Sequence, residues 1–231
     1  MSVPQPVRSP RRRAPRNTLN PDRILDAAIA LLDRDGAEAF TMRALAEELG
    51  VATMAIYSHF RNKDEISDAV AQRLLDGIEL PCGGALAPRC ELREVCLGVH
   101  RLFTEHPSAL QLLTSRPLRG DDAIGVIDRM LALLRRSGLS AKDAVRAQVT
   151  LMQYIVGSAL WSIRRSRALC EEGARERVRA KFDALSPERY PTLTSLAPEL
   201  MCAQEDAVAQ FEWGLDHLLC GLLAGQGPPE D

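Results

Sequence analysis

The sequence predicts an all-α protein built from two domains. No stretch of its 231 residues shows the sustained alternation of apolar and polar residues that indicates a β-strand. Apolar residues instead recur at helical spacing in one segment after another. Residues 1–63 carry more Lys and Arg than Asp and Glu, whereas the rest of the chain is acidic overall, and the net charge is −2. This division of charge indicates nucleic-acid binding at one end only.

Residues 1–20 form a basic arm that contains no acidic residue. Ser, Pro and Arg dominate the arm, so it buries no core and is expected to be disordered on its own. Its arginines can enter a narrow minor groove beside a DNA-reading domain. Alternatively, they add only nonspecific, salt-sensitive affinity. We expect weak contacts of little sequence specificity from Arg8, Arg11, Arg12, Arg13 and Arg16.

Residues 21–66 predict a three-helix DNA-binding domain of the helix-turn-helix type. Thr41 stands where an N-cap belongs, and Gly50 supplies the positive φ that ends the helix. A second short helix follows at about residues 52–58 and turns Ile56 inward. Its outward side chains are uncharged, unlike those of a helix that only needs to be soluble, and they suit base edges and thymine methyl groups. They are Thr53, Met54, Tyr57 and Ser58.

A third helix is predicted to begin at Lys63. Asn62 and Glu65 have the spacing of a capping box. The Lys63 cation opposes the helix dipole at this end, which makes sense if a DNA phosphate docks there. The alternative is a lysine that is simply solvated.

This segment resembles the DNA-binding domain of the Tet repressor (TetR) family. The matching residues include a first helix with Ile24, Ala28 and Gly36, and the string Ile56-Tyr57-Ser58-His59-Phe60 followed by Asn62-Lys63. The resemblance implies phosphate contacts from Thr41, Tyr57, His59 and Lys63, and approaches to bases from Arg43, Thr53 and Met54. For His59, a buried histidine bonded to a carbonyl is an equal alternative. The predicted DNA-binding set is Thr41, Arg43, Thr53, Met54, Tyr57, Ser58, His59 and Lys63.

Residues 67–225 predict a helical ligand-binding and dimerisation domain, followed by a disordered tail at 226–231. Between Glu171 and Leu200 the helical pattern weakens around three prolines. The predicted helices are a connector from Asp64 to Leu80, then Glu91–Glu105, Ser108–Leu113, Asp121–Arg136, a helix capped by Ser140 that reaches Ser166, a turn or two at Ala174–Phe182, and Glu205–Ala224.

Two of these helices indicate a homodimer. Residues 145–163 are apolar nearly all round, and a helix of this kind must be covered on every side. The string FEWGLDHLLCGL resembles the final helix of tetracycline-repressor-like C-terminal domains. A four-helix bundle across a two-fold axis covers both helices, and a core within a monomer is the alternative. The predicted interface consists of Val156, Leu160, Phe211, Leu215, Leu218 and Leu222.

The helices between these parts are expected to enclose a small-molecule effector. Tetracycline repressors hold drug-bound magnesium with a His and a Glu, and the resemblance aligns Leu112 and Trp161 with those ligands, so tetracycline–magnesium is not expected. A mostly apolar lining suits a hydrophobic effector with one or two hydrogen-bonding groups. Each lining residue, Met152 and Phe103 above all, is alternatively ordinary core. The predicted lining is His100, Phe103, Leu112, Leu113, Arg116, Met152, Gln153 and Trp161.

Other classes of protein fit the sequence less well. No nucleophile elbow, phosphate-binding glycine loop or paired metal ligands occur, so we predict no enzymatic activity, cofactor or metal. The longest apolar run is shorter than a membrane span, and a cytoplasmic protein that binds double-stranded DNA is expected. Two rivals are a redox-responsive repressor that senses through Cys82 or Cys90, and a helical interaction module whose DNA-binding end is vestigial.

Overall fold

The computed structural model describes residues 19–78, 86–108, 110, 112, 121–169 and 173–224. The predicted all-α fold is confirmed, since these residues contain helices and no strand. The arm up to residue 18, the segment 79–85 with Cys82, the effector residues Leu113 and Arg116, and the tail from residue 225 lie outside the described residues. The helices are α1 Pro21–Ala39, α2 Met42–Leu49, α3 Thr53–Tyr57, α4 Lys63–Asp76, α5 Pro88–Glu105, α7 Asp121–Arg136, α8 Ala141–Leu169, α9 Ala174–Asp183, α10 Pro191–Ser195, α11 Ala197–Glu205 and α12 Ala207–Ala224.

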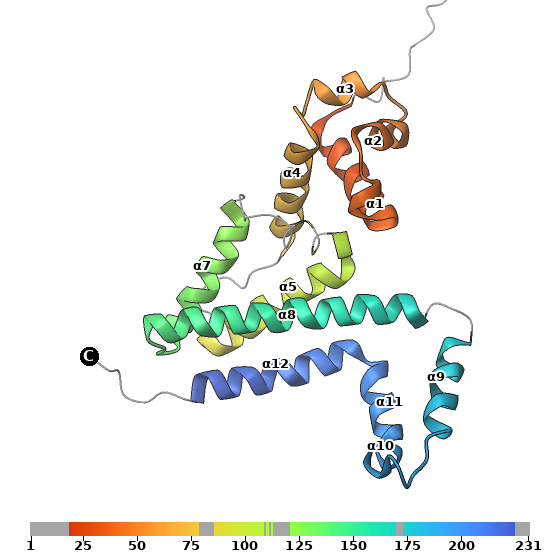
Figure 1. Cartoon of the computed structure of the whole chain (residues 1–231). Helices are drawn as coiled ribbons and strands as arrows, with labels where there is room; N and C mark the ends of the chain where they lie inside the picture. The colour runs from red at the N-terminus through yellow and green to blue at the C-terminus, as the bar shows by residue number, and fades with distance from the viewer. Residues whose placement is uncertain are drawn as a thin grey trace, which may run out of the picture.

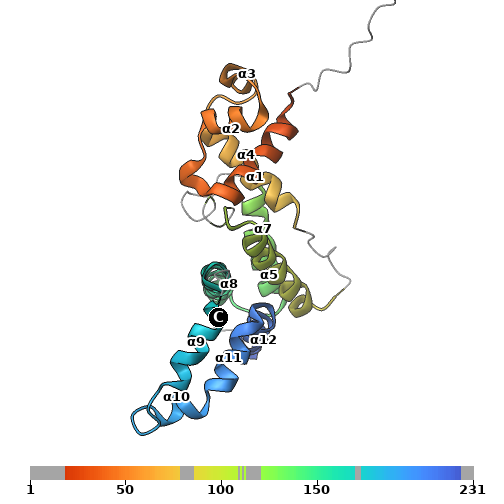
Figure 2. The ribbon, with the colours of Figure 1, turned by 90° about the vertical axis from the view of Figure 1, so that its right-hand side faces the viewer.

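The molecule is elongated, with α1–α3 at one end (Figure 1). Helix α4 leads from this end to a second group of helices, in which α5 packs on α7, α8 and α12. Helices α9, α10 and α11 form a lobe at the far end, as the perpendicular view also shows (Figure 2). The predicted boundary between residues 66 and 67 falls inside α4, which runs without interruption from Lys63 to Asp76. The domains are therefore joined by one continuous helix.

The caps that the sequence predicts position the helix-turn-helix motif. The Thr41 hydroxyl oxygen accepts a hydrogen bond from the Ala44 amide at 3.1 Å, and Gly50 has a φ of 64°. Asn62 Oδ1 accepts from the Glu65 amide at 2.8 Å. The return bond of the capping box differs from expectation, because the Glu65 carboxylate accepts from the Arg61 amide instead of that of Asn62.

The core of the DNA-binding end lies where α1, α2, α3 and α4 meet. Its side chains recur every three or four residues along each helix, as an amphipathic helix requires. Ile56 is the inward residue of α3, as the sequence predicts, and Phe60 just after the helix is also buried. The fully or almost fully buried members are Ile24, Ala28, Leu31, Leu32, Phe40, Leu45, Ile56, Ile66 and Val70.

Prolines in the weakly patterned segment start helices instead of preventing them. Pro191 occupies the first turn of α10, and Pro198 occupies the first turn of α11. A proline is tolerated there because the missing N–H would have no partner within the helix. Among the described side chains of residues 173–206, only Ala174 is buried. The lobe thus has almost no core of its own.

The packing of α12 differs from part of the predicted dimer interface. Phe211 and Leu215 are 1% and 0% exposed and pack inside their own chain, so neither is free to meet a partner. They lie with Leu219 at intervals of four residues, on the side of α12 that faces α5 and α8. The other predicted interface residues keep some exposure, with Leu160 at 47% and Val156, Leu218 and Leu222 half-buried.

Three stacked rings join α5, α8 and α12. The His100 and Phe211 rings stack with centroids 3.7 Å apart, and Tyr154 stacks on Phe211 at 5.2 Å. The Tyr154 hydroxyl donates to the Phe211 carbonyl oxygen at 3.0 Å. It reaches that oxygen across Gly214, where a Cβ atom would lie only 2.0 Å from the hydroxyl oxygen. Gly214 therefore permits the close approach of α8 and α12.

Candidate DNA-binding surface and effector region

Helix α3 lies at the outer end of the molecule (Figures 1 and 2). Met54 is 76% exposed and Tyr57 is 43% exposed, which is unusual for large apolar and aromatic side chains. Ser58 is also exposed, and its hydroxyl donates to the Ala55 carbonyl at 2.6 Å. Thr53 is half-buried at the first turn of the helix. An uncharged, exposed helix side of this composition can contact base edges in a major groove.

Residues of α2 and of the segment after α3 border this side. Thr41 and Arg43 are exposed at the start of α2. Arg43 Nε lies 2.9 Å from Glu47 Oε1, but both side chains are open to solvent, so the pair is weak and its guanidinium is free to move. His59 is exposed, and the buried-histidine alternative is therefore wrong. Its ring is accessible to an anion such as a phosphate.

The position of Lys63 differs from both predictions for it, a phosphate contact and a side chain that is simply solvated. Its ammonium donates to the Ala37 carbonyl at 3.3 Å and stands 5.4 Å from the centre of the Phe40 ring. The last carbonyls of a helix lack partners within it and carry partial negative charge, so a cation near the end of α1 is stabilised. Lys63 ties α4 to α1 in this structure.

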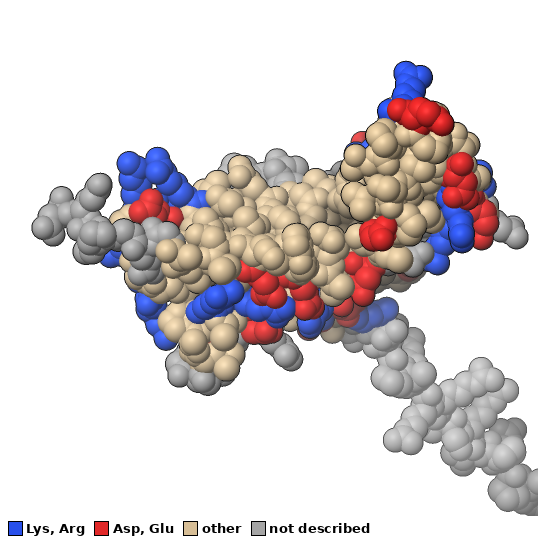
Figure 3. Space-filling model, turned by 90° about the horizontal axis from the view of Figure 1, so that it is seen from below, with Lys and Arg blue, Asp and Glu red and all other residues tan. Residues whose placement is uncertain are grey.

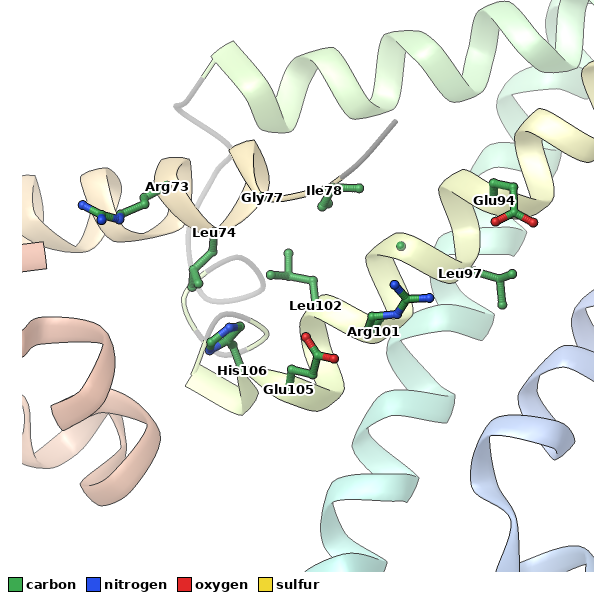
Figure 4. A pocket seen from close by; sticks show the side chains of 11 residues that line it. Arg73, Leu74, Gly77, Ile78, Glu94, Leu97, Arg101, Leu102, Glu105 and His106 are labelled. Carbon is green, nitrogen blue, oxygen red and sulfur yellow. The ribbon is translucent and has the colours of Figure 1, made fainter. Parts of the chain in front are cut away.

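A pocket among the described residues lies where α4 and the residues after it meet α5. Its volume is about 490 Å³, within the range of small-molecule sites. Figure 4 shows Leu74 from α4, and Ile78 from the residues that follow α4, across from Leu102, with Arg101 on α5. The lining residues are Arg73, Leu74, Gly77, Ile78, Glu94, Leu97, Gly98, Arg101, Leu102, Glu105 and His106.

None of the predicted effector residues lines this pocket. His100 and Phe103 are 4% and 3% exposed and belong to the core, whereas Gln153 and Trp161 are exposed. For His100 and Phe103 the structure matches the alternative of ordinary core, and Gln153 and Trp161 lie on the outer side of α8. A sequence signal that was missed is Gly77 with Gly98, two small residues that line the pocket, and a Cβ atom on Gly98 would lie 2.9 Å from Ile78 Cγ2. Leu112 and Met152 are half-buried against the core.

Burial of His100 gives the protein a distinct acid sensitivity. Desolvation lowers the pKa of His100 to about 4 from its ordinary 6.5. Above pH 6.5 the His100 ring is mostly neutral in the folded and in the unfolded chain. Between pH 6.5 and 4 the unfolded chain binds a proton on this ring, whereas the folded chain does not. The free energy of unfolding is therefore expected to fall by about 3 kcal/mol across that window.

Chemical denaturation at pH 7 and pH 4.5 measures this loss. His100→Phe keeps a ring on Phe211 and removes the titration, so most of the difference between the two pH values should disappear. His217→Gln, which changes an exposed histidine on α12, should keep the wild-type difference. Equal pH dependence in wild type and His100→Phe would contradict the expectation.

The described residues contain four free cysteines, which differ in exposure. In that part of the chain, no helix is both long and apolar enough to cross a bilayer. Cys96 is fully buried on α5, and burial raises its pKa to about 12. Cys90 and Cys220 are exposed.

Two family descriptions match the chain. Residues 24–70 match bacterial regulatory proteins of the tetR family, and residues 89–225 match the tetracyclin repressor-like C-terminal domain. Together the matches begin within α1 and extend beyond α12.

Individual relatives agree with these descriptions. The HTH-type transcriptional repressor DrrR1 of Streptomyces coeruleorubidus is 31% identical over 217 residues, which cover 91% of this chain and 79% of DrrR1. The class A tetracycline repressor from transposon 1721 of Escherichia coli is 34% identical over 62% of this chain and 66% of its own. The Streptomyces coelicolor TetR family protein ActR in complex with actinorhodin superposes with a TM-score of 0.75 at 28% identity, covering 91% of this chain and 98% of that one.

Proposed function

This chain belongs to the tetR family of bacterial regulatory proteins, and from that premise we propose that it releases a palindromic operator when a small hydrophobic molecule binds its effector domain. The protein is a ligand-responsive, DNA-binding transcriptional repressor, and regulators of this family act as dimers. What we add is the symmetry of the operator, the residues of each contact and the chemistry of the effector. We also place the protein in the cytoplasm and assign it no catalytic activity.

The exposed side of α3 carries the proposal. Met54 and Tyr57 are exposed on α3, with no charged residue between them in the sequence. We propose that Thr53 and Met54 contact bases, together with Arg43, and that Thr41, Tyr57, Ser58 and His59 contact phosphates. Lys63 is proposed to act indirectly, by holding α4 against the end of α1. A dimer then presents two such surfaces about one DNA turn apart.

The dimer interface is proposed on the exposed sides of α8 and α12. Val145, Val149 and Leu160 lie on one side of α8 and are 53%, 46% and 47% exposed. Trp213 on α12 is 61% exposed. Seen from below, the middle of the molecule is covered largely by uncharged residues (Figure 3). A surface of this kind on a helix pair suits burial against a second copy.

Negative charge introduced on this surface by substitution is expected to separate the protomers. Val149→Glu together with Leu160→Glu would bury two carboxylates per protomer at the interface, which is unfavourable without partners. Sedimentation equilibrium should show a monomer for this variant at a concentration where the wild type is a dimer. Val178→Glu on α9 is the control and should leave the dimer intact. A dimer of unchanged affinity would move the interface elsewhere.

A neutral or weakly polar effector fits the residues better than tetracycline–magnesium does. Leu112 and Trp161 stand at the positions that the resemblance aligns with the drug–metal ligands, and neither offers an oxygen or an imidazole. ActR was solved with actinorhodin, and this relative supports an organic effector here. The redox and interaction-module alternatives are not favoured.

The test is a footprint of the purified dimer on the DNA that flanks its own gene, at a fixed and stated salt concentration. Protection of a palindrome with half-sites about one turn apart supports the proposal and supplies a probe for an effector screen. Protection of a site without two-fold symmetry would refute the palindromic operator. Candidate compounds are then scored by release of that probe, and a compound that tightens binding would overturn the direction of the response.

A further inference from the structure

Asp33 connects α1 directly to the effector domain. Its Oδ2 atom lies 2.8 Å from His106 Nδ1, and its Oδ1 atom accepts a hydrogen bond from the Ser108 hydroxyl at 2.5 Å. The Asp33 and His106 side chains are 25% and 32% exposed, so solvent screens them only in part. Both oxygens of one carboxylate from the DNA-binding domain are thus held by residues beyond α5.

The two residues that hold Asp33 are themselves fixed by the backbone. His106 ends α5, where its amide donates to the Leu102 carbonyl at 2.9 Å. Pro107 follows, and Ser108 is only 3% exposed. A buried hydroxyl needs a hydrogen-bond partner, and Asp33 supplies it. Leu110, two residues further on, is buried in the core and anchors this segment to the effector domain.

A second attachment changes the mechanics of the joint between the domains. Helix α4 is continuous through the joint and packs on α7, and one helix alone resists stretching better than it resists bending or turning. The end of α5 lies beneath α1 (Figure 1), so the contacts of Asp33 are displaced from the axis of α4. Two separated attachments fix an angle that a single one leaves adjustable.

We propose that Asp33, His106 and Ser108 form an interdomain clamp that sets the angle of the DNA-binding domain and so the separation of the two reading helices. These three are positioning residues, because they do not touch DNA. The inference rests on the proposed function for the dimer on a two-half-site operator. It goes beyond that function by naming the contact that makes the dimer selective for one spacing.

The test compares operators whose half-site separation is changed one base pair at a time. The wild type should lose about tenfold or more in affinity when the spacing departs from the optimum. Asp33→Ala should bind a single half-site as the wild type does but lose less than about threefold at the same altered spacings. Asp35→Ala is the matched control, because Asp35 pairs with Arg34 inside its own domain. Ser108→Thr keeps the hydroxyl and should keep the wild-type profile.

An Asp33→Ala profile as sharp as that of the wild type would overturn the clamp. A double-mutant cycle in thermal unfolding tests it without DNA: the midpoint shifts of Asp33→Ala and Ser108→Ala should not add in the double variant. Additive shifts would overturn the clamp even if the operator is found. Failure of the wild type to bind any palindrome, with non-additive shifts, would instead refute the proposed function and leave the clamp supported.

Discussion

Met54→Glu is expected to lower operator affinity by at least about 30-fold. A Glu at this position places a carboxylate in each of two phosphate-lined grooves and removes an apolar contact, and one unfavourable base contact costs about 1–3 kcal/mol per half-site. Two half-sites double that cost in a dimer. Because Met54 is 76% exposed, the free energy of unfolding should hardly change. Fluorescence anisotropy with the footprinted operator measures the effect.

Ile124→Glu is the matched control for this substitution. Ile124 is also a large apolar residue exposed on a helix, at 52%, but it lies on α7 in the effector domain. Its replacement adds the same charge and should leave operator affinity within about threefold. If Met54→Glu bound as tightly as this control, α3 would not be the reading helix.

Gly214→Ala is expected to destabilise the folded protein by about 3 kcal/mol. The new Cβ would lie 2.0 Å from the Tyr154 hydroxyl oxygen and 2.8 Å from its Cζ atom, so the ring must move. Moving it strains a packed core, at a cost of about 1–3 kcal/mol, and breaks the hydrogen bond to the Phe211 carbonyl, which contributes about 1 kcal/mol. Urea denaturation of the purified variant measures the loss.

Two further variants separate this clash from the general effect of replacing a helical glycine. Gly125→Ala on α7 places a Cβ where nothing lies within 4 Å, and it should be neutral or slightly stabilising. Gly214→Ala combined with Tyr154→Leu removes the ring that clashes and should be less destabilised than the sum of its single variants. Equal stability of Gly214→Ala and wild type would show that α8 and α12 adjust without cost.

The DNA-binding motif was predictable because its information is local. Thr41 and Asn62 each cap a helix within three residues of themselves, and Gly50 meets a backbone requirement at its own position. The exposed, uncharged side of α3 follows from the direction in which Ile56 is buried. Each of these features depends on neighbours in sequence, and so a single chain reveals them.

The helices of the effector domain were predictable from the sequence, but the position of its binding site was not. Its predicted helices α7 and α8 begin where the sequence places them, and Ser140 caps α8 through the Asp143 amide. The inward side of α12 was misassigned for Phe211 and Leu215, because a helix that is apolar on several sides offers no single direction for its core. Lys63 was misassigned as well, since its partner Ala37 lies 26 residues away.

The sequence alone determined the fold class and the family, and it predicted α3 as the reading helix, since helical periodicity, caps and a compact motif depend on consecutive residues. Only the tertiary structure decided that Asp33 meets His106 and Ser108, that Tyr154 reaches across Gly214, and that the described pocket lies between α4 and α5. These contacts join residues more than fifty positions apart or on separate helices. Their formation depends on how helices pack and turn relative to one another, and no local pattern specifies that arrangement.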